Sequence, residues 1–222
     1  MLGDISRLLN RAQYIIKTDG IIGVVKRGAV YLLPNIFKFE SVYLYRHSTG
    51  LQLDEANYKP RRQDVEFKVI RTNQEADLLV PNYTDLREIM FDARSILDKG
   101  GIAVCLYIGR ELAHISWLAV NGEARDSVDE IPYEIKFSEK QACTGKTFTD
   151  PKYRGQNLMV YGNYMKLNYL REIGVSSLFH AVGVKNIASQ KGYKKFDPTI
   201  YAQGRYLKIF NLKFWRQKPL VS

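Results

Sequence analysis

Residues 148–173 read FTDPKYRGQNLMVYGNYMKLNYLREI, and this stretch decides how the rest of the chain is interpreted. An apolar strand end leads through a Pro turn into Arg154, Gly155, Gln156 and Asn157, and a long amphipathic helix follows at once. The first turn of a helix has unpaired backbone N–H groups and partial positive charge, so it favours an anion. Arg154 adds a guanidinium that can bind two phosphate oxygens. The stretch therefore predicts a loop that binds phosphate groups.

The composition is that of a globular chain with a substantial core. Of the 222 residues, 45% are hydrophobic, and 15 Tyr and 10 Phe are present. Cys105 and Cys143 lie in apolar runs and are expected to be buried thiols, because a disulfide framework needs more cysteines. Three dispersed His and no paired Cys give no metal-ligand spacing, so no metal is expected. No apolar run reaches the roughly 18 residues of a membrane helix, and no signal peptide is evident.

The net charge of +10 is concentrated at the two ends of the chain. Residues 1–62 carry a net charge of +5, residues 63–184 carry −3, and residues 185–222 carry +8. Basic ends can attract phosphates, an anionic membrane or an acidic partner, and they can equally be solvated surface. We therefore expect a cytoplasmic protein, with peripheral association with a membrane as a further option.

The chain is expected to divide near residue 62. Apolar residues recur at helical spacing over residues 8–16 and again over residues 21–33, with basic residues between them. These two helices are interpreted as a hairpin packed on the main domain, or as an element that docks on a membrane surface or a partner. Residues 48–62 are expected to be a linker. The expected domains are thus a basic helical extension with its linker, residues 1–62, and a main domain, residues 63–222.

The main domain alternates strand and helix patterns in an order that indicates an α/β (α+β) fold. Runs of adjacent strands with helices at both flanks favour a mixed, mostly antiparallel central sheet. Residues 109–111 are expected to form a tight hairpin, and residues 121–122 a turn. The expected strands cover residues 67–70, 102–108, 112–120, 131–137, 141–149, 175–184 and 201–215, and the expected helices cover residues 84–98, the stretch from the loop to 173, and 186–192.

This order, with the Arg154 loop opening the central helix, resembles the GNAT (GCN5-related N-acetyltransferase) superfamily. The resemblance covers about residues 65–210. In that family a strand ends in a Pro-x-x-Arg-Gly pattern, which residues 149–155 match, and the loop reads Arg/Gln-x-x-Gly-x-Gly/Ala. Here Asn157 and Met159 take the two glycine positions. Asn tolerates positive φ, so the turn can survive; Met159 either reshapes the phosphate contact or points into the core.

A second motif of the family is an Asn followed three residues later by Ser or Ala, on the helix after the next strand. Asn186 and Ser189 match this spacing. Gly192 and Tyr193 follow this motif after fewer residues than is usual in the family, which indicates that this helix is shortened or bent. The resemblance implies a GNAT-like sheet that is splayed where acyl-CoA binds.

The resemblance also implies a chemistry. A neutral amine would attack the thioester of bound acetyl-CoA, or of another acyl-CoA, directly in a ternary complex, with no metal. Loop amides and Arg154 would hold the diphosphate, and the splayed strand end would pair with the pantetheine amides as though adding a strand. The implied cofactor-binding residues are Phe148, Thr149, Arg154, Gly155, Gln156, Asn157, Leu158, Met159, Asn186 and Ser189.

Proton transfer needs an acid for the leaving thiolate and a base for the amine. Tyr193 is the candidate acid by position, Tyr201 is a second candidate, and ordinary packing explains either. Glu134 is the candidate base on a strand expected to flank the cleft, although it can be a solvent-facing strand residue. His114 is a further candidate, with a hydrogen-bonded core histidine as the plainer interpretation. Asp150 is better explained as a residue that stabilises the turn before Pro.

The acceptor is expected to be a small-molecule amine, such as an amino sugar or a cell-surface intermediate, and the protein a monomer or homodimer. Two alternatives stay open. In one, the same fold uses a long-chain acyl group carried by an acyl carrier protein, an acidic partner that would suit the basic ends. In the other, the chain is a non-enzymatic basic module for nucleic acid or membrane. Nucleic acid has charge alone in its favour, because no helix-turn-helix, zinc finger or aromatic RNA-binding signature is visible.

Overall fold

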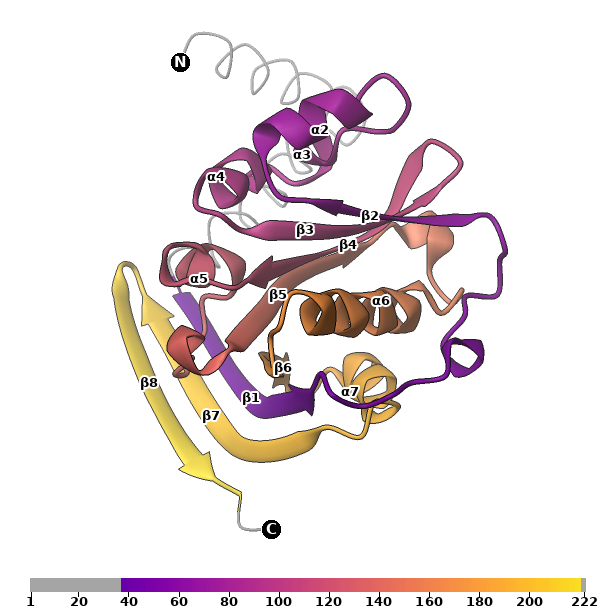
Figure 1. The fold of residues 1–222 in the computed structure, drawn as a ribbon. Coiled ribbons are helices and arrows are strands. Elements are labelled where there is room, and N and C mark those ends of the chain that lie inside the picture. The colour runs from indigo at the N-terminus through magenta and orange to yellow at the C-terminus, as the bar shows by residue number, and fades with distance from the viewer. Residues whose placement is uncertain (1–36, 221–222) are drawn as a thin grey trace, which may run out of the picture. The chain divides into compact units, whose positions relative to one another are not determined.

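The structure is a computed structural model that describes residues 37–220, and its centre is an eight-stranded sheet with the order β2-β3-β4-β5-β6-β1-β7-β8 (Figure 1). The β2–β3, β3–β4, β4–β5 and β1–β6 pairs are antiparallel, whereas β5 and β6 are parallel. The mixed, mostly antiparallel sheet predicted from the sequence is therefore confirmed. The strands are β1 (Phe37–Ser48), β2 (Val65–Ile70), β3 (Ile102–Ile108), β4 (Glu111–Ala119), β5 (Gln141–Thr149), β6 (Ser177–Gly183), β7 (Thr199–Ile209) and β8 (Leu212–Pro219).

Contacts divide the chain into two compact units, which are treated separately below. Among the described residues, the larger unit comprises residues 42–204 and 217–220, and the smaller comprises residues 37–41 and 205–216. All the helices of the described chain belong to the larger unit. They are η1 (Glu55–Asn57), α2 (Asn73–Leu79), α3 (Leu86–Ile89), α4 (Ala93–Asp98), α5 (Gly122–Val128), η2 (Phe137–Glu139), η3 (Pro151–Tyr153), α6 (Leu158–Glu172) and α7 (Ile187–Lys194).

The central strands β3 and β4 are buried along almost their whole length because helices cover both faces of this part of the sheet. Side chains of a strand point alternately to opposite faces. Leu118 of β4 packs in one cluster with Leu167 and Leu170 of α6. Its neighbour Trp117 points the other way and donates its indole N–H to Met90 Sδ, at 3.4 Å, just after α3. A strand covered on both sides is expected to be almost wholly apolar. β3 has a continuous apolar run, whereas β4 also buries His114 and Ser116.

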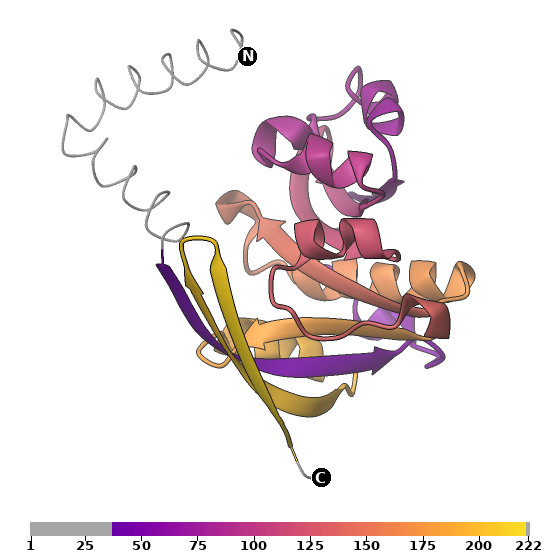
Figure 2. The same ribbon diagram turned by 90° about the vertical axis from the view of Figure 1, so that its left-hand side faces the viewer.

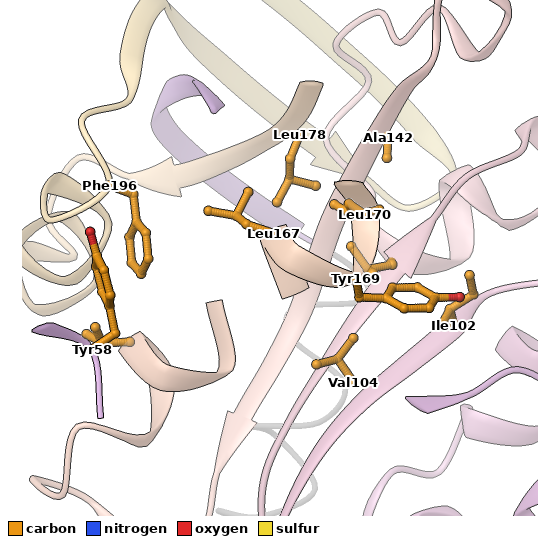
Figure 3. Packing of buried hydrophobic residues seen from close by; sticks show 11 residues of the cluster. Tyr58, Ile102, Val104, Ala142, Leu167, Tyr169, Leu170, Leu178 and Phe196 are labelled. Carbon is orange, nitrogen blue, oxygen red and sulfur yellow. The ribbon is translucent and has the colours of Figure 1, made fainter. Parts of the chain in front are cut away.

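The main apolar cluster lies between α6 and the sheet (Figure 3). Leu167 and Leu170 of α6 lie beside Leu178 of β6. At the other end of the cluster Tyr58 stacks on Phe196, with ring centroids 4.7 Å apart. Tyr58 follows directly after η1, so a residue from the expected linker is part of the core.

Residues 37–62 differ from the expectation of an extension and linker. Residues 37–48 form β1, which lies between β6 and β7 in the strand order. Asp54 then caps η1 by accepting a hydrogen bond from the Ala56 N–H at 3.0 Å. The linker expected over residues 48–62 is therefore wrong for the part that builds η1 and buries Tyr58. The helical pair predicted for residues 8–33 lies outside the described residues.

The helix predicted over residues 84–98 is wrong as one element, because it breaks at Met90. Met90 is extended, with φ −110° and ψ 108°, and separates α3 from α4. The Met90 side chain accepts a hydrogen bond from the Trp117 N–H, a tertiary contact that the sequence pattern of residues 84–98 does not reveal. α2 also forms without having been predicted; Thr72 caps it by accepting from the Glu75 N–H.

The strand predicted over residues 131–137 does not form, although Ile131 and Tyr133 are buried as the alternation indicated. The physical reason is Arg125 of α5. Its guanidinium donates to the backbone carbonyls of Asp129, Ile131 and Tyr133, so a side chain satisfies acceptors that a neighbouring strand would otherwise take. The turn predicted at residues 121–122 is instead the start of α5, where the Asn121 side chain accepts from the Ala124 N–H at 2.9 Å.

The single strand predicted over residues 201–215 is wrong, because the chain turns at Phe210 and Asn211 and forms two strands, β7 and β8. The other elements follow the prediction closely. The β3–β4 hairpin turns at Gly109, which has φ +58°. α6 begins after the Arg154 loop and ends before Gly174, whose φ of +79° suits a residue that terminates a helix. In the described part of the chain, the helices lack the combined length and apolarity that a bilayer-crossing helix requires.

We predict that Gly145→Ala destabilises the protein whereas Gly122→Ala does not. A Cβ on Gly145 would lie 2.3 Å from the Val128 carbonyl oxygen, which is backbone and cannot turn aside, whereas a Cβ on Gly122 would meet nothing within 4 Å. Such overpacking costs about 1–3 kcal/mol. Thermal unfolding followed by circular dichroism would measure it, and equal melting temperatures for the two variants would contradict the packing described for β5.

Candidate active site

The parallel strands β5 and β6 part soon after they begin. They pair through residues 141–143 and 177–179 and no further. On its other edge β5 pairs with β4, but the register shifts: Ile115 is opposite Phe148, whereas Trp117 is opposite Gly145, so β5 carries one extra residue. This β-bulge bends β5 away from β6. On the side of β6, the backbone of residues 144–149 has no paired strand in the described chain, and an extended ligand can pair with such an edge as an additional strand.

The loop after β5 adopts the conformation that the sequence predicted. Asp150 accepts a hydrogen bond from the Lys152 N–H at 2.8 Å, which confirms its role in the turn. Gly155 has φ +77° and Asn157 has φ +67°, so Asn157 takes the left-handed conformation in place of glycine. The Asn157 side-chain amide donates to the carbonyls of Tyr58 and Lys59, at 3.0 Å each. Residues near η1 therefore hold the loop in place.

The backbone N–H groups of this loop are available to a ligand. In the described chain, no acceptor is found for the N–H groups of residues 155–160, and Tyr161 is the first to bond back along the helix, to the Asn157 carbonyl at 3.0 Å. Arg154 is exposed; its Nε donates to the Thr149 carbonyl at 3.3 Å, which leaves the outer guanidinium nitrogens free to turn outward. Unpaired N–H groups at a helix N-terminus, beside a guanidinium, form an anion site.

The side chains of the loop do not block these N–H groups. A Cβ on Gly192 of α7 would lie 2.1 Å from the methyl carbon of Met159, so the Met159 side chain packs against α7. Of the two interpretations of Met159, the structure supports the one in which it points into the core. Leu158 is buried beside it, and the Gln156 carbonyl accepts from the Arg61 N–H at 3.2 Å.

Asn186 and Ser189 have a local structural role in α7. The Asn186 side chain accepts from the Ser189 N–H at 3.1 Å and so caps the helix at its first turn. The motif that these residues match therefore fixes where α7 begins, and with it the position of Tyr193 farther along the same helix.

Tyr193 is buried where β5 and β6 part. Its ring lies 4.0 Å from the His180 ring of β6, centroid to centroid. Burial raises the pKa of Tyr193 to about 12, while the nearby polar side chains of Asn163 on α6 and Thr147 on the bulge of β5 act in the opposite direction. The Asn163 Nδ2 has no acceptor among the described residues. Tyr193 is therefore protonated at neutral pH and able to donate.

The other catalytic candidates are placed less favourably. Glu134 is exposed and belongs to the segment that Arg125 holds, so its expected position on a strand flanking a cleft is wrong. His114 is buried, with Nδ1 2.8 Å from the Thr149 hydroxyl; burial, and the charge of Lys166, lower its pKa to about 3. This confirms the interpretation of a hydrogen-bonded core histidine. Tyr201 lies half-buried on β7, and burial raises its pKa to about 12.

The sequence analysis missed a buried basic cluster beneath α6. Lys166 is 1% exposed, and its Nζ donates to the Thr144 hydroxyl at 2.9 Å. No carboxylate pairs with it in the described chain, and burial lowers its pKa to about 7. His47 and His180, also buried, share a hydrogen bond of 2.9 Å between their Nε2 atoms. The pKa of each of these histidines is lowered, by burial first and with a contribution from Lys166.

The burial of Lys166 could have been predicted from a helical wheel of residues 158–172. Lys166 follows Gly162 by four residues and precedes Leu170 by four, so it lies on the stripe that faces the sheet. A lysine in that stripe is buried unless the helix is rotated about its own axis. The three histidines are far apart in the sequence, and only the pairing of β1 with β6 brings His47 to His180. Residues 37–220 contain no group of three or more His, Cys, Asp or Glu side chains arranged to hold a metal ion.

Comparisons with known proteins bear on the fold. No family model matches the sequence, and no curated protein matches it. The chain is similar in structure to a GCN5-related glucosamine N-acetyltransferase region in a fungal multi-domain GH3 beta-N-acetylglucosaminidase, with a TM-score of 0.51 and 13% identity, over 82% of this chain and 22% of that one. At this identity the likeness shows the fold alone: the chain has the fold of the GNAT superfamily.

Other solved structures are similar at lower scores. A GCN5-related N-acetyltransferase from Sphaerobacter thermophilus matches with a TM-score of 0.48 and 6% identity, over 90% of this chain and 57% of that one. One from Kribbella flavida matches with a TM-score of 0.48 and 12% identity, over 81% of this chain and 62% of that one. This chain therefore spans less than two thirds of the length of these three proteins.

We predict that Lys166→Met raises stability at neutral pH and that the gain shrinks as the pH rises. The folded pKa of Lys166 is lowered from 10.5 to about 7, so between these values the unfolded chain binds more protons and stability increases with pH. Lys166→Met removes this dependence. The gain at neutral pH should be on the order of a few kcal/mol, because each pKa unit corresponds to about 1.4 kcal/mol.

Urea unfolding of both proteins at several pH values between neutral and alkaline measures this difference. Lys99→Met is the matched control, because Lys99 is exposed and its replacement leaves the burial of α6 unchanged. Parallel stability curves for the wild type and Lys166→Met across this range would show that the Lys166 amine is solvated.

Proposed function

We propose that this chain is an acyl-CoA-dependent N-acyltransferase that transfers an acyl group, acetyl in the simplest case, to a primary amine. One observation carries the proposal: the unpaired N–H groups of residues 155–160 lie at the start of α6, directly after the strand that parts from β6. A diphosphate at the helix and an extended arm along β5 match the two halves of a CoA molecule. The GNAT fold supports the same class.

The residues present fit acyl-CoA in charge and in hydrogen bonding. The loop N–H groups and Arg154 would bind the diphosphate oxygens, as charge-assisted hydrogen bonds. The β5 backbone at Phe148 and Thr149 would bind the pantetheine amides. The unpaired Asn163 Nδ2 offers a further donor near the end of that path. When bound, the donor supplies a thioester carbon that is open to attack by an amine.

Tyr193 is the residue that we assign to proton transfer. Formation of the C–N bond breaks the C–S bond, the amine loses one proton and the departing sulfur gains one. Tyr193 donates to that sulfur, since its raised pKa keeps it protonated, and the polar side chains of Thr147 and Asn163 lie near its ring. No candidate base is placed beside Tyr193 among the described residues, so the amine passes its proton to ordered water.

The acceptor is proposed to be a small-molecule amine, with an amino sugar or a cell-surface intermediate as the first compounds to test. The similar fungal region is described as a glucosamine N-acetyltransferase, which makes glucosamine a reasonable starting substrate. We propose a monomer or homodimer that works in the cytoplasm. A panel of amines with acetyl-CoA, read by thiol release, would identify the acceptor.

We predict that Arg154→Ala weakens CoA binding by about 1–3 kcal/mol, the value of a lost charge-assisted hydrogen bond. Gly155→Val should weaken CoA binding more. Valine is strained at the φ of +77° found there, and its side chain would keep the ligand away from the loop backbone. Isothermal titration with CoA measures both.

Arg171→Ala is the control for Arg154→Ala, since Arg171 is an equally exposed arginine at the far end of α6. CoA affinity that stays the same in Arg154→Ala and in Gly155→Val would remove the basis of the proposal. If an acyl carrier protein stabilised this protein against thermal unfolding and CoA did not, the acyl donor would be a carrier-bound acyl group.

We predict that Tyr193→Phe lowers kcat by about 10²–10⁴-fold, the usual contribution of a positioned acid, and leaves CoA affinity unchanged. Phenylalanine keeps the ring packed against His180, so the fold is retained. Tyr201→Phe, which removes the second candidate hydroxyl, should retain kcat. If kcat fell in Tyr201→Phe and not in Tyr193→Phe, Tyr201 would be the acid and Tyr193 a packing residue.

A further inference from the structure

The smaller unit exposes large apolar side chains that no described residue covers. It comprises residues 37–41 and 205–216. Isolated exposed apolar residues are ordinary, but several on one short pair of segments indicate a surface that binds something. The exposed fractions are 54% for Phe37, 59% for Phe39, 65% for Phe210, 64% for Leu212 and 53% for Phe214.

Phe210 stands at the tip of the β7–β8 hairpin in a conformation that does not suit it. The connection is two residues long, Phe210 and Asn211, and Phe210 has φ +53°. Gly, Asn or Asp is the usual residue at such a position, because a bulky side chain is strained at positive φ. A phenylalanine there weakens the turn, and its ring is 65% exposed. This combination points to a function for the exposed ring.

The same hairpin is strongly basic. Between residues 205 and 216 the sequence has Arg205, Lys208, Lys213 and Arg216, and no acidic residue. Figure 2 shows β7 and β8 as a hairpin, drawn in yellow. Strand alternation places Leu212, Phe214 and Arg216 on one face of β8. Apolar and cationic side chains are thus interleaved along the same strand.

We propose that this aromatic–basic hairpin, residues 205–216 together with Phe37 and Phe39, docks on an anionic lipid surface. Aromatic side chains favour the boundary between headgroups and acyl chains, and lysine and arginine favour anionic headgroups. An anionic bilayer offers both environments within the length of a side chain, whereas an acidic protein surface offers the charge and not the apolar layer for Phe210. The inference does not depend on the proposed acyl transfer.

The test uses the full chain and vesicles of phosphatidylcholine alone or of phosphatidylcholine mixed with phosphatidylglycerol, at low and high salt. The protein should sediment with the mixed vesicles, weakly or not at all with the neutral ones, and less at high salt, because screening weakens the attraction. Lys213→Gln with Arg216→Gln should lower the partition constant by about 30-fold, from about fivefold for each basic residue near the surface.

Phe210→Asn with Phe214→Thr separates docking from folding. Asn suits positive φ at the turn and Thr suits a strand, so the hairpin should be at least as stable, while binding falls about tenfold or more with the loss of two inserted rings. Phe91→Asn is the matched control: Phe91 is 92% exposed in the larger unit and should be replaceable without effect. Lys99→Gln with Arg110→Gln is the control for the charge change.

Four outcomes would overturn the proposal. The first is equal sedimentation of the wild type and both hairpin variants. The second is a concentration-dependent dimer, seen by analytical ultracentrifugation and lost in the aromatic variant, without vesicle binding. The third is binding of a single-stranded oligonucleotide in place of vesicles. The last is a loss of thermal stability in the aromatic variant with no change in vesicle binding, which would mean that residues 1–36 cover the surface.

Discussion

Parallel neighbouring strands that stop pairing after three residues leave backbone donors and acceptors that the sheet itself cannot satisfy. β5 and β6 are such a pair, and the other features of the larger unit depend on their separation. The bulge on β5 turns the strand outward, the loop after it delivers α6, and Tyr193 of α7 lies at the gap. The sheet thus leaves one stretch of β5 without a strand partner on the side of β6.

α6 contributes to the candidate site both at its N-terminus and along the face that packs on the sheet. Its N-terminus presents the unpaired N–H groups, and its inner face carries Asn163 and Lys166 toward the separating strands. A buried amine without a carboxylate costs stability at neutral pH, and the three buried histidines are kept neutral in its neighbourhood. An apolar residue would fill the same space at lower free energy, so the buried amine lowers the stability of the fold.

The sequence predicted the parts of the site that depend on neighbouring residues. The Pro-x-x-Arg-Gly pattern, the left-handed Asn157 and the helix after it are consecutive, so their conformation follows from local φ preferences and from capping. The sequence did not predict elements decided by distant contacts. Arg125 takes the carbonyls that would have made residues 131–137 a strand, and Met90 breaks a helix beneath Trp117. Neither partner can be read from a local pattern.

The sequence by itself determined the conformation of the loop before α6, the mixed sheet-and-helix class of the fold after residue 65 and the basic character of both ends, because each depends on residue type and short-range spacing. Tertiary structure alone decided that β1 enters the sheet beside β6, that His47 meets His180, and that Lys166 is enclosed without a carboxylate. These depend on which surfaces far apart in the chain bury each other, and the free energy of that burial is shared by many residues, so no single stretch encodes it.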